Sequence, residues 1–387
     1  MGPTALRASR AGYNEAIRRT TEQQLLLNLV RLQYRDSPYF LEVASVSTQF
    51  AFTDSGNVTG TINEGPNPVN PDVLRIGGTI GYEERPTVTL TPLQGRDFVN
   101  KLLAPLHADL VVMLSQSGWR IDRVLPLTVA RINGLENASG SSGPTPDRAP
   151  RYKSFARVCA LFRSLQTQNL LELGYEPLMI DASSPLPARQ ATMTDAVQAA
   201  DKGLRLVTST DGQTVTLKTA SRRLVWRISP AAAQTPQVAE LCKLLSLDPN
   251  RRVFEIIPGA GSIESGGGRQ DHINIAMRSL MGTLFYLAQA VQVPPSHRAR
   301  GLVTQTRDES GQVFDWQNVT GGLLRVHTSP LKPLNAAVTV PYRRHWYYID
   351  DNDLDSKSTF VLLGQLFALQ AGGAESVAPV LTLPVGK

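Results

Sequence analysis

The chain has 387 residues, of which 42% are hydrophobic, 19% charged and 6% aromatic. This composition is typical of a globular protein and excludes a collagenous chain, a fully disordered chain and a small disulfide-knotted protein. The net charge of +6 is spread along the whole length, and the basic residues form no long cluster. We therefore expect no nucleic-acid partner, because such a partner requires basic residues gathered on one face.

Residues 1–135 predict an N-terminal α+β domain. Apolar residues return at helical spacing over 13–34, which predicts an amphipathic helix. Near-alternation over 40–52, followed by Asp54-Ser55-Gly56-Asn57, predicts a strand and a turn. The remaining expected elements are a loop over 63–72, strands over 73–82 and 87–91, helices over 93–103 and 108–116, and a strand over 121–132.

Residues 136–150 are rich in Ser, Gly and Pro and predict a linker or an exposed loop. Residues 151–387 then predict a C-terminal α+β domain, with 188–257 as an optional subdomain. The pair Asp211-Gly212 between two β-rich runs predicts a hairpin. Helices are expected over 153–168, 192–200, 235–247, 273–291 and 355–372, and strands over 204–208, 214–218, 224–228, 302–306, 312–316, 323–327, 336–340 and 346–349. Together these elements predict an α+β fold of two domains, with mixed or antiparallel sheets and packed amphipathic helices.

The sequence motifs that would indicate an enzyme are incomplete in this chain. A glycine-rich stretch begins at Gly259 but has Glu264 where a dinucleotide loop needs its third glycine. The five histidines are far apart, and the acidic run 350–355 lacks the glycine and glutamate of a calcium loop. We therefore expect no cofactor and no metal, and assign no catalytic residue. Cys159 and Cys242 lie in apolar helical runs, and whether they are bridged stays open.

Residues 342–348 concentrate aromatic rings beside two arginines. Aromatic and arginine side chains dominate binding hot spots, so Arg343, Arg344, Trp346 and Tyr348 are the candidate interaction surface. The structural alternative is a strand whose rings alternate between buried and exposed positions.

Several stretches of the chain resemble a family of uncharacterised bacterial, mainly proteobacterial, proteins that look like exported lipoproteins. The stretches are residues 22–32 with Tyr34-Arg35-Asp36, the block 278–282, Trp346-Tyr347-Tyr348-Ile349-Asp350, residues 355–360, and 379–386. The resemblance implies a location in the bacterial cell envelope, either the periplasm or the outer membrane and surface, with peripheral outer-membrane association if a lipid anchor exists. The first residues carry neither a signal core nor a cysteine, so a cytoplasmic location is the alternative.

The favoured hypothesis is a non-enzymatic cell-envelope protein with a structural, scaffolding or assembly role, whose partners are other protein subunits or further copies of itself. The first alternative is a hydrolase or carbohydrate-processing enzyme, which would need two carboxyl groups with shifted pKa in a cleft. The second is a ligand-binding module that uses the strand 342–348.

Overall fold

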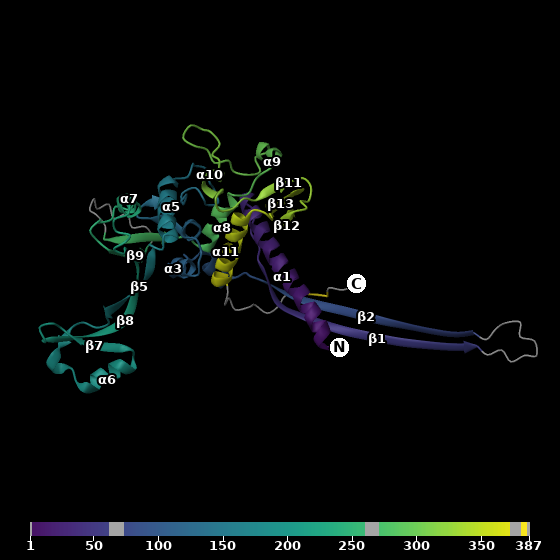
Figure 1. The fold of residues 1–387 in the computed structure, drawn as a ribbon, viewed down its shortest axis with the longest axis horizontal. Helices are drawn as coiled ribbons and strands as arrows, with labels where there is room; N and C mark the ends of the chain where they lie inside the picture. Colours follow the sequence, from purple (N-terminus) through teal and green to yellow (C-terminus); the bar gives the residue numbers. More distant parts are fainter. Residues whose placement is uncertain (1, 62–72, 260–270, 372–380, 385–387) are drawn as a thin grey trace, which may run out of the picture. The chain divides into compact units, whose positions relative to one another are not determined.

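The computed structural model describes residues 2–61, 73–259, 271–371 and 381–384 (Figure 1). The fold is mixed α/β with mixed and antiparallel sheets, which confirms the predicted class. The chain forms two compact units. The first unit comprises Met1–Gln24, Pro38–Val99 and Ala371–Lys387, and the second comprises Leu25–Ser37 and Asn100–Gln370.

The first unit contains a long two-stranded ribbon (Figure 1). Strands β1 (Leu41–Thr61) and β2 (Val73–Pro92) pair antiparallel over their whole length, and β14 (Leu381–Pro384) pairs with the end of β2. The turn predicted at residues 54–57 is therefore wrong, and so is the break predicted between residues 82 and 87. The turn-forming residues are held extended by cross-strand pairing, which outweighs their local preference. The predicted loop over 63–72 lies outside the described residues.

The central sheet of the second unit has the strand order β4-β3-β10-β9-β8-β5, and β6 and β7 also pair with β8. Only β9 and β10 run parallel; the other pairs are antiparallel. The strands are β3 (Val129–Ile132), β4 (Leu135–Glu136), β5 (Glu172–Asp181), β6 (Leu186–Pro187), β7 (Leu204–Thr208), β8 (Thr214–Arg227), β9 (Val253–Pro258) and β10 (His272–Met277).

Helices before, between and after these strands supply the rest of the core. They are α1 (Gly2–Gln33), α2 (Arg96–Leu103), α3 (Asp109–Gln116), α4 (Ile121–Thr128), α5 (Lys153–Thr167), η1 (Ala188–Gln190), α6 (Met193–Asp201), α7 (Pro236–Leu244), α8 (Leu280–Ala288), α9 (Pro295–Ala299), α10 (Gln317–Thr320) and α11 (Leu354–Ala371). Thr192 and Thr235 cap α6 and α7 with their side-chain oxygens, and both helices begin close to where the sequence predicted them. Among the helices of the described ranges, none is both long enough and apolar enough to cross a bilayer.

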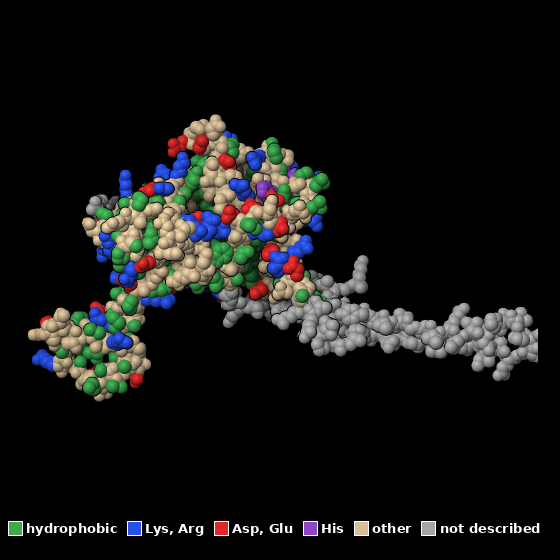
Figure 2. Space-filling view, viewed as in Figure 1, with side chains coloured by type: hydrophobic (Ala, Val, Ile, Leu, Met, Phe, Trp, Pro, Cys, Tyr) green, Lys and Arg blue, Asp and Glu red, His purple; other side chains and the backbone are tan. Residues whose placement is uncertain are grey.

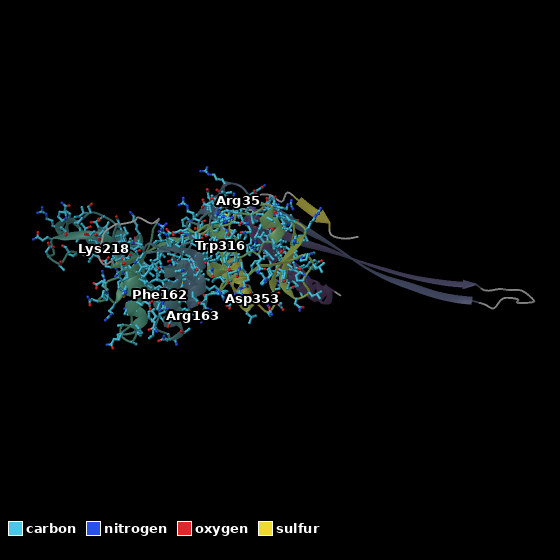
Figure 3. All side chains as sticks on the ribbon, turned by 90° about the horizontal axis from the view of Figure 1, so that it is seen from above. Arg35, Phe162, Arg163, Lys218, Trp316 and Asp353 are labelled. Carbon is cyan, nitrogen blue, oxygen red and sulfur yellow. The ribbon has the colours of Figure 1, made fainter. Side chains whose placement is uncertain are left out.

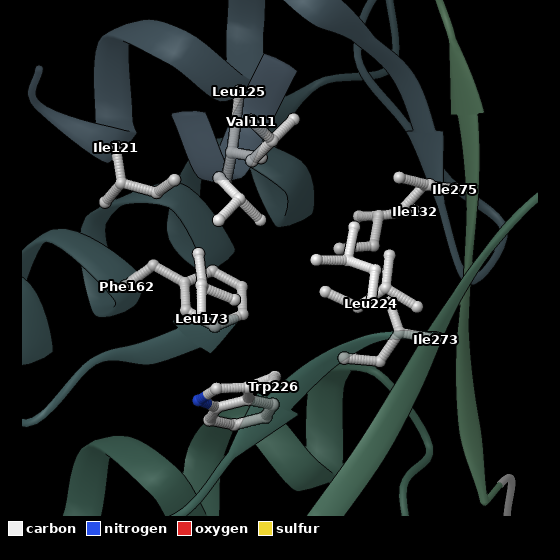
Figure 4. Close-up of a pocket in the computed structure, with 12 residues that line it drawn as sticks. Val111, Ile121, Leu125, Ile132, Phe162, Leu173, Leu224, Trp226, Ile273 and Ile275 are labelled. Carbon is white, nitrogen blue, oxygen red and sulfur yellow. The ribbon is translucent and has the colours of Figure 1, made fainter. Parts of the chain in front are cut away.

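The core beside the central sheet is aromatic and apolar. The ring of Phe162, on α5, lies 5.1 Å from Trp226 on β8, and Trp226 stacks on Phe254 at 5.8 Å. Phe162 and Trp226 help to line an apolar cavity of about 30 Å³ (Figure 4). The next residue on α5, Arg163, is half-buried and donates to Gln166, so the helix is amphipathic as predicted (Figure 3).

Three further predictions in the second unit are wrong. Residues 121–132 form α4 and then β3 rather than one strand, because a short apolar run fits either a helix or a strand. Within 273–291, the first residues belong to β10, and α8 begins only after Ser279, which caps it. Residues 302–316 form no strand, and Arg307 makes only isolated bridges, to Val313 and to Arg148. Strand β5 was not predicted.

The Ser- and Gly-rich segment 136–150 lies inside the second unit, and a domain division there stays a prediction. Asn137 and Ser142 are buried, and both accept hydrogen bonds from the buried guanidinium of Arg278. That guanidinium also lies 4.3 Å from the ring centroid of Tyr286, and burial lowers its pKa to about 10. The described part of this segment is therefore anchored to the core.

A third sheet closes the second unit. It consists of β11 (His327–Ser329), β13 (His345–Asp350) and β12 (Ala336–Tyr342), all antiparallel, in that order. Strands β12 and β13 were predicted within a few residues, whereas β11 begins where the predicted strand 323–327 ends. The hairpin between β12 and β13 carries most of the predicted interaction residues.

Candidate functional site

The candidate site is the tip of the β12–β13 hairpin, which we call the hairpin tip (Tyr342, Arg343, Arg344 and His345). Tyr342 pairs with His345, so Arg343 and Arg344 form a two-residue turn. Their φ angles are 47° and 64°, and positive φ at both positions is the feature of the type I′ turn that suits the twist of a hairpin. Asn and Gly are the usual residues there, because other side chains are strained in this conformation at a cost of about 1–2 kcal/mol each.

Three buried side chains beside the hairpin tip form a hydrogen-bonded chain. The hydroxyl of Tyr34 lies 2.6 Å from Nδ1 of His297 and 2.6 Å from the hydroxyl of Tyr347. Tyr34 is 4% exposed, His297 5% and Tyr347 0%. Burial raises the pKa of Tyr34, and burial with nearby positive charge lowers the pKa of His297. All three groups are therefore neutral near pH 7, and this chain of hydrogen bonds fixes the strand in place.

A carboxylate anchors the hairpin tip directly. Asp36, just after α1, accepts hydrogen bonds from the hydroxyl of Tyr342 and from Nη2 of Arg343, the latter at 2.9 Å. Burial alone would raise the pKa of Asp36, but these two hydrogen bonds and the positive charge of Arg343 outweigh burial, so the pKa is lowered. The guanidinium of Arg343 also lies 5.0 Å from the ring centroid of Tyr34. Arg343 is thus held by an acid and an aromatic ring at once.

Arg344 differs from its neighbour. Its side chain is exposed, and it forms no hydrogen bond or ion pair with any part of the chain that the structure describes. The turn therefore fixes one arginine internally and presents the other to solvent.

The remaining predicted residues, Trp346 and Tyr348, alternate with buried Tyr347 along β13 and are half-buried. Lys332 Nζ lies 5.5 Å from the ring centroid of Trp346, and the ring of His327 lies 5.5 Å from Tyr348. Strand alternation places these two rings on the face opposite Tyr347. The four predicted residues are thus divided between the turn and one strand face.

Sequence reasoning missed Tyr34, Asp36 and His297, which complete the cluster. Tyr34 and His297 are separated by 263 positions, so no spacing rule could join them. The one available signal was the strand alternation of β13, which predicts a buried Tyr347 and hence a need for hydroxyl partners.

A second surface lies on the small module formed by β6, η1, α6, β7 and the facing part of β8. A cavity of about 410 Å³ lies between α6 and the strands, with Asp195, Lys202 and apolar residues among its lining. Met193 is 85% exposed, and other apolar side chains are spread over the module (Figure 2). Asp195 is already engaged in capping α6. The module therefore offers apolar surface rather than a cluster of free polar groups.

The alternative enzymatic function would need two carboxyl groups with shifted pKa in a cleft. Every described carboxyl group with a shifted pKa has it lowered by hydrogen bonds or ion pairs, which is opposite to the raised pKa of a general acid. Within the described ranges, no three His, Cys, Asp or Glu side chains come together as a metal site requires. Cys159 and Cys242 are buried free thiols, and burial raises the pKa of both.

Comparison with known proteins identifies no relative of this chain. No protein-family model, no curated protein and no solved structure matches this chain.

Proposed function

We propose that this chain is a non-enzymatic structural or assembly protein of the bacterial cell envelope, and that it binds another protein subunit through the hairpin tip. The observation that carries the proposal is the pair of arginines at positive φ, one anchored and one presented. The resemblance to exported bacterial proteins supports the location.

The strain in the turn is the first argument. A turn selected for stability alone would contain Asn and Gly, which adopt positive φ at little cost. Arg343 and Arg344 adopt it instead. Strained backbone at exposed, chemically versatile residues is typical of binding sites.

The rigidity of the hairpin tip is the second argument. The hydrogen bonds of Asp36 and the buried pair Tyr34 and Tyr347 hold the turn before any partner arrives. A surface that is already ordered loses less conformational entropy on binding. Arg344 then offers five N–H donors in a planar fork, which fits an acidic partner surface.

The experiment is site-specific photo-crosslinking in cells that express the full chain. A photo-reactive amino acid replaces Arg344 in one variant and the exposed Arg252, on the β8–β9 connection, in a control variant. We expect a discrete crosslinked protein from position 344 and none from position 252. Arg344→Glu, with the photo-reactive residue moved to position 332, is expected to lower the yield at least about tenfold, the effect of losing a hot-spot residue.

Two results would overturn the proposal. One is equal crosslinking from positions 344 and 252. The other is recovery of the native chain in the cytoplasmic fraction, which would remove the envelope location while leaving the binding surface to be tested separately.

A further inference from the structure

The β1–β2 ribbon, defined as Leu41–Thr61 paired with Val73–Pro92, is unusually long. Strands of globular proteins usually have 3–10 residues, whereas these have 21 and 20. At about 3.4 Å per residue, such a strand is about 70 Å long when fully extended. An isolated two-stranded hairpin is at best marginally stable in water, so a ribbon of this length needs a surrounding that stabilises it.

The sequence of the ribbon alternates in register on both strands. Beyond the bulge between Val43 and Ser45, even-numbered positions of β1 pair with even-numbered positions of β2 and so share one face. That face includes Val46, Phe50, Phe52, Ile76, Ile80 and Val88. The odd-numbered face includes Ser47, Gln49, Thr53, Thr79, Arg85 and Thr89. One face of the ribbon is therefore predominantly apolar, and the other is almost wholly polar.

The length of the apolar run bears on what covers it. The described part of the run extends from Phe50 to the end of β1 at Thr61, and on the paired strand from Val73, where β2 begins, to Tyr82. A strand that crosses the hydrocarbon of a bilayer at a tilt of about 45° needs about 9–11 residues. The aromatic residues Phe50, Phe52 and Tyr82 gather at one end of the run, where aromatic rings favour the boundary between hydrocarbon and water.

Two acids interrupt the apolar face. Glu84 lies opposite Phe50, at the end of the run, and Asp54 lies opposite Ile80, within it. An acidic residue within a bilayer is costly but is tolerated more readily when it lies near the boundary. The opposite face carries Arg75, Glu83 and Arg85, so both arginines of the ribbon lie on its polar side.

We propose that the apolar face of the β1–β2 ribbon inserts into a lipid bilayer. A protein partner would not require an apolar run that is long enough to cross the hydrocarbon and has aromatic residues at its end. This proposal rests on unit 1 alone and does not depend on the hairpin tip.

Insertion has a consequence for the edges of the ribbon. In the described chain, β1 pairs only with β2, and β14 covers β2 only at residues 87–90. In hydrocarbon, unpaired backbone N–H and C=O groups are too costly to leave without partners. Inserted copies of this chain must therefore pair along these edges, so the membrane-bound form is an oligomer.

The first test is a scan of the full chain with an environment-sensitive fluorophore on single cysteines at positions 75–80. Cys159 and Cys242 are buried, and the unsubstituted chain measures their background labelling. With vesicles of phosphatidylethanolamine and phosphatidylglycerol, we expect the emission at positions 76, 78 and 80 to shift to the blue and that at 75, 77 and 79 to stay at its aqueous wavelength. A pattern without this period of two would overturn the proposal.

The second test compares neighbouring positions on opposite faces. Ile80→Lys and Thr79→Lys add the same charge to the same strand one residue apart. In vesicle flotation, Ile80→Lys is expected to lower the bound fraction about tenfold or more, because lysine at bilayer depth costs about 2–4 kcal/mol. Thr79→Lys is expected to keep binding within about twofold.

Two other outcomes would also contradict insertion of the ribbon into a bilayer. If the native chain does not float with vesicles, the proposal is wrong. If Ile80→Lys instead abolishes self-association in water, measured by sedimentation, then a second copy covers the apolar face and lipid does not. Circular dichroism of both lysine variants identifies a variant that fails to fold, and the fluorophore scan then decides.

Discussion

Two of the hairpins in this chain, β12–β13 and the β1–β2 ribbon, are stabilised in different ways. The β12–β13 hairpin is short, and its strand β13 is buried by Tyr34 and His297 from distant parts of the second unit. The β1–β2 ribbon is three times as long, and only β14 pairs with it among the described elements. Side-chain packing within the unit specifies the first hairpin, whereas regular alternation along the chain specifies the second. The comparison teaches that a hairpin without its own core must find one outside its chain.

The largest expected effect breaks the packing of the short hairpin. Tyr347→Ala removes a ring that is 0% exposed and a hydroxyl bonded to Tyr34. The free energy of unfolding of the second unit should fall by about 3–5 kcal/mol, measured by urea denaturation with tryptophan fluorescence. The matched change in the ribbon, Tyr82→Ala, should leave that transition unchanged. An equal loss from both variants would mean that the two hairpins depend on one core.

A smaller loss is expected when the anchor of the hairpin tip is removed. Asp36→Ala deletes the acceptor of Tyr342 and Arg343, and the side chain of Asp36 is 40% exposed, so solvent replaces part of the interaction. The free energy of unfolding should fall by about 1 kcal/mol. Asp36→Asn, which keeps an acceptor, should lose less. If Asp36→Ala is neutral by denaturation, the hairpin tip is held by the buried tyrosines alone.

The buried histidine makes the short hairpin sensitive to acid. The pKa of His297 is lowered by burial, so the unfolded chain binds a proton at a higher pH than the native chain does. The contribution of neutral His297 to the free energy of unfolding is fully present above about pH 6.5. It is lost as the pH falls from there through the lower pKa of the native state. His297→Asn keeps an acceptor for Tyr34 and should flatten this part of the pH profile. A profile that is unchanged by the substitution would show that other groups cause the acid loss.

The smallest expected effect is a gain. Arg344→Gly relieves the strain of a φ of 64° but adds backbone entropy to the unfolded chain. The two terms leave a net stabilisation of about 0.5 kcal/mol, visible as a slightly higher Tm in calorimetry. The same variant should bind the partner less well if the arginine is there for recognition. A variant that is less stable would show that Arg344 contributes to the fold rather than to binding.

Local sequence signals predicted part of the fold. The helix start at Thr235 and the hairpin at Asp211-Gly212 were confirmed, because these elements depend on residues close in sequence. A short apolar run gave a wrong prediction: the helix expected over 273–291 begins only after Ser279, and its first residues belong to β10, which pairs with β9 as a parallel strand. The choice between helix and strand there depends on a partner that local spacing does not reveal.

Only the part of the candidate site that is contiguous in sequence was predicted. The aromatic and arginine content of residues 342–348 pointed to the hairpin, but the partners Asp36 and His297 come from elsewhere in the chain. The division of Arg343 and Arg344 into an anchored and a presented residue depends on Asp36, and composition alone could not show it. The turn predicted at Asp54-Ser55-Gly56-Asn57 failed for a related reason, since the pairing of the complete ribbon overrides four local preferences.

The anchoring of residues 137 and 142 affects where the chain can be cut or extended. The composition of residues 136–150 is that of a linker, which would suggest it as a place for a tag or a protease site. A change between residues 137 and 142 would separate the carbonyl of Asn137 from the hydroxyl of Ser142, which both accept hydrogen bonds from the guanidinium of Arg278. A buried cation would then lose its acceptors, so fragments cut at this point should be prone to aggregation. Exposed loop tips elsewhere, such as the one at Asp211-Gly212, are better places to open the chain.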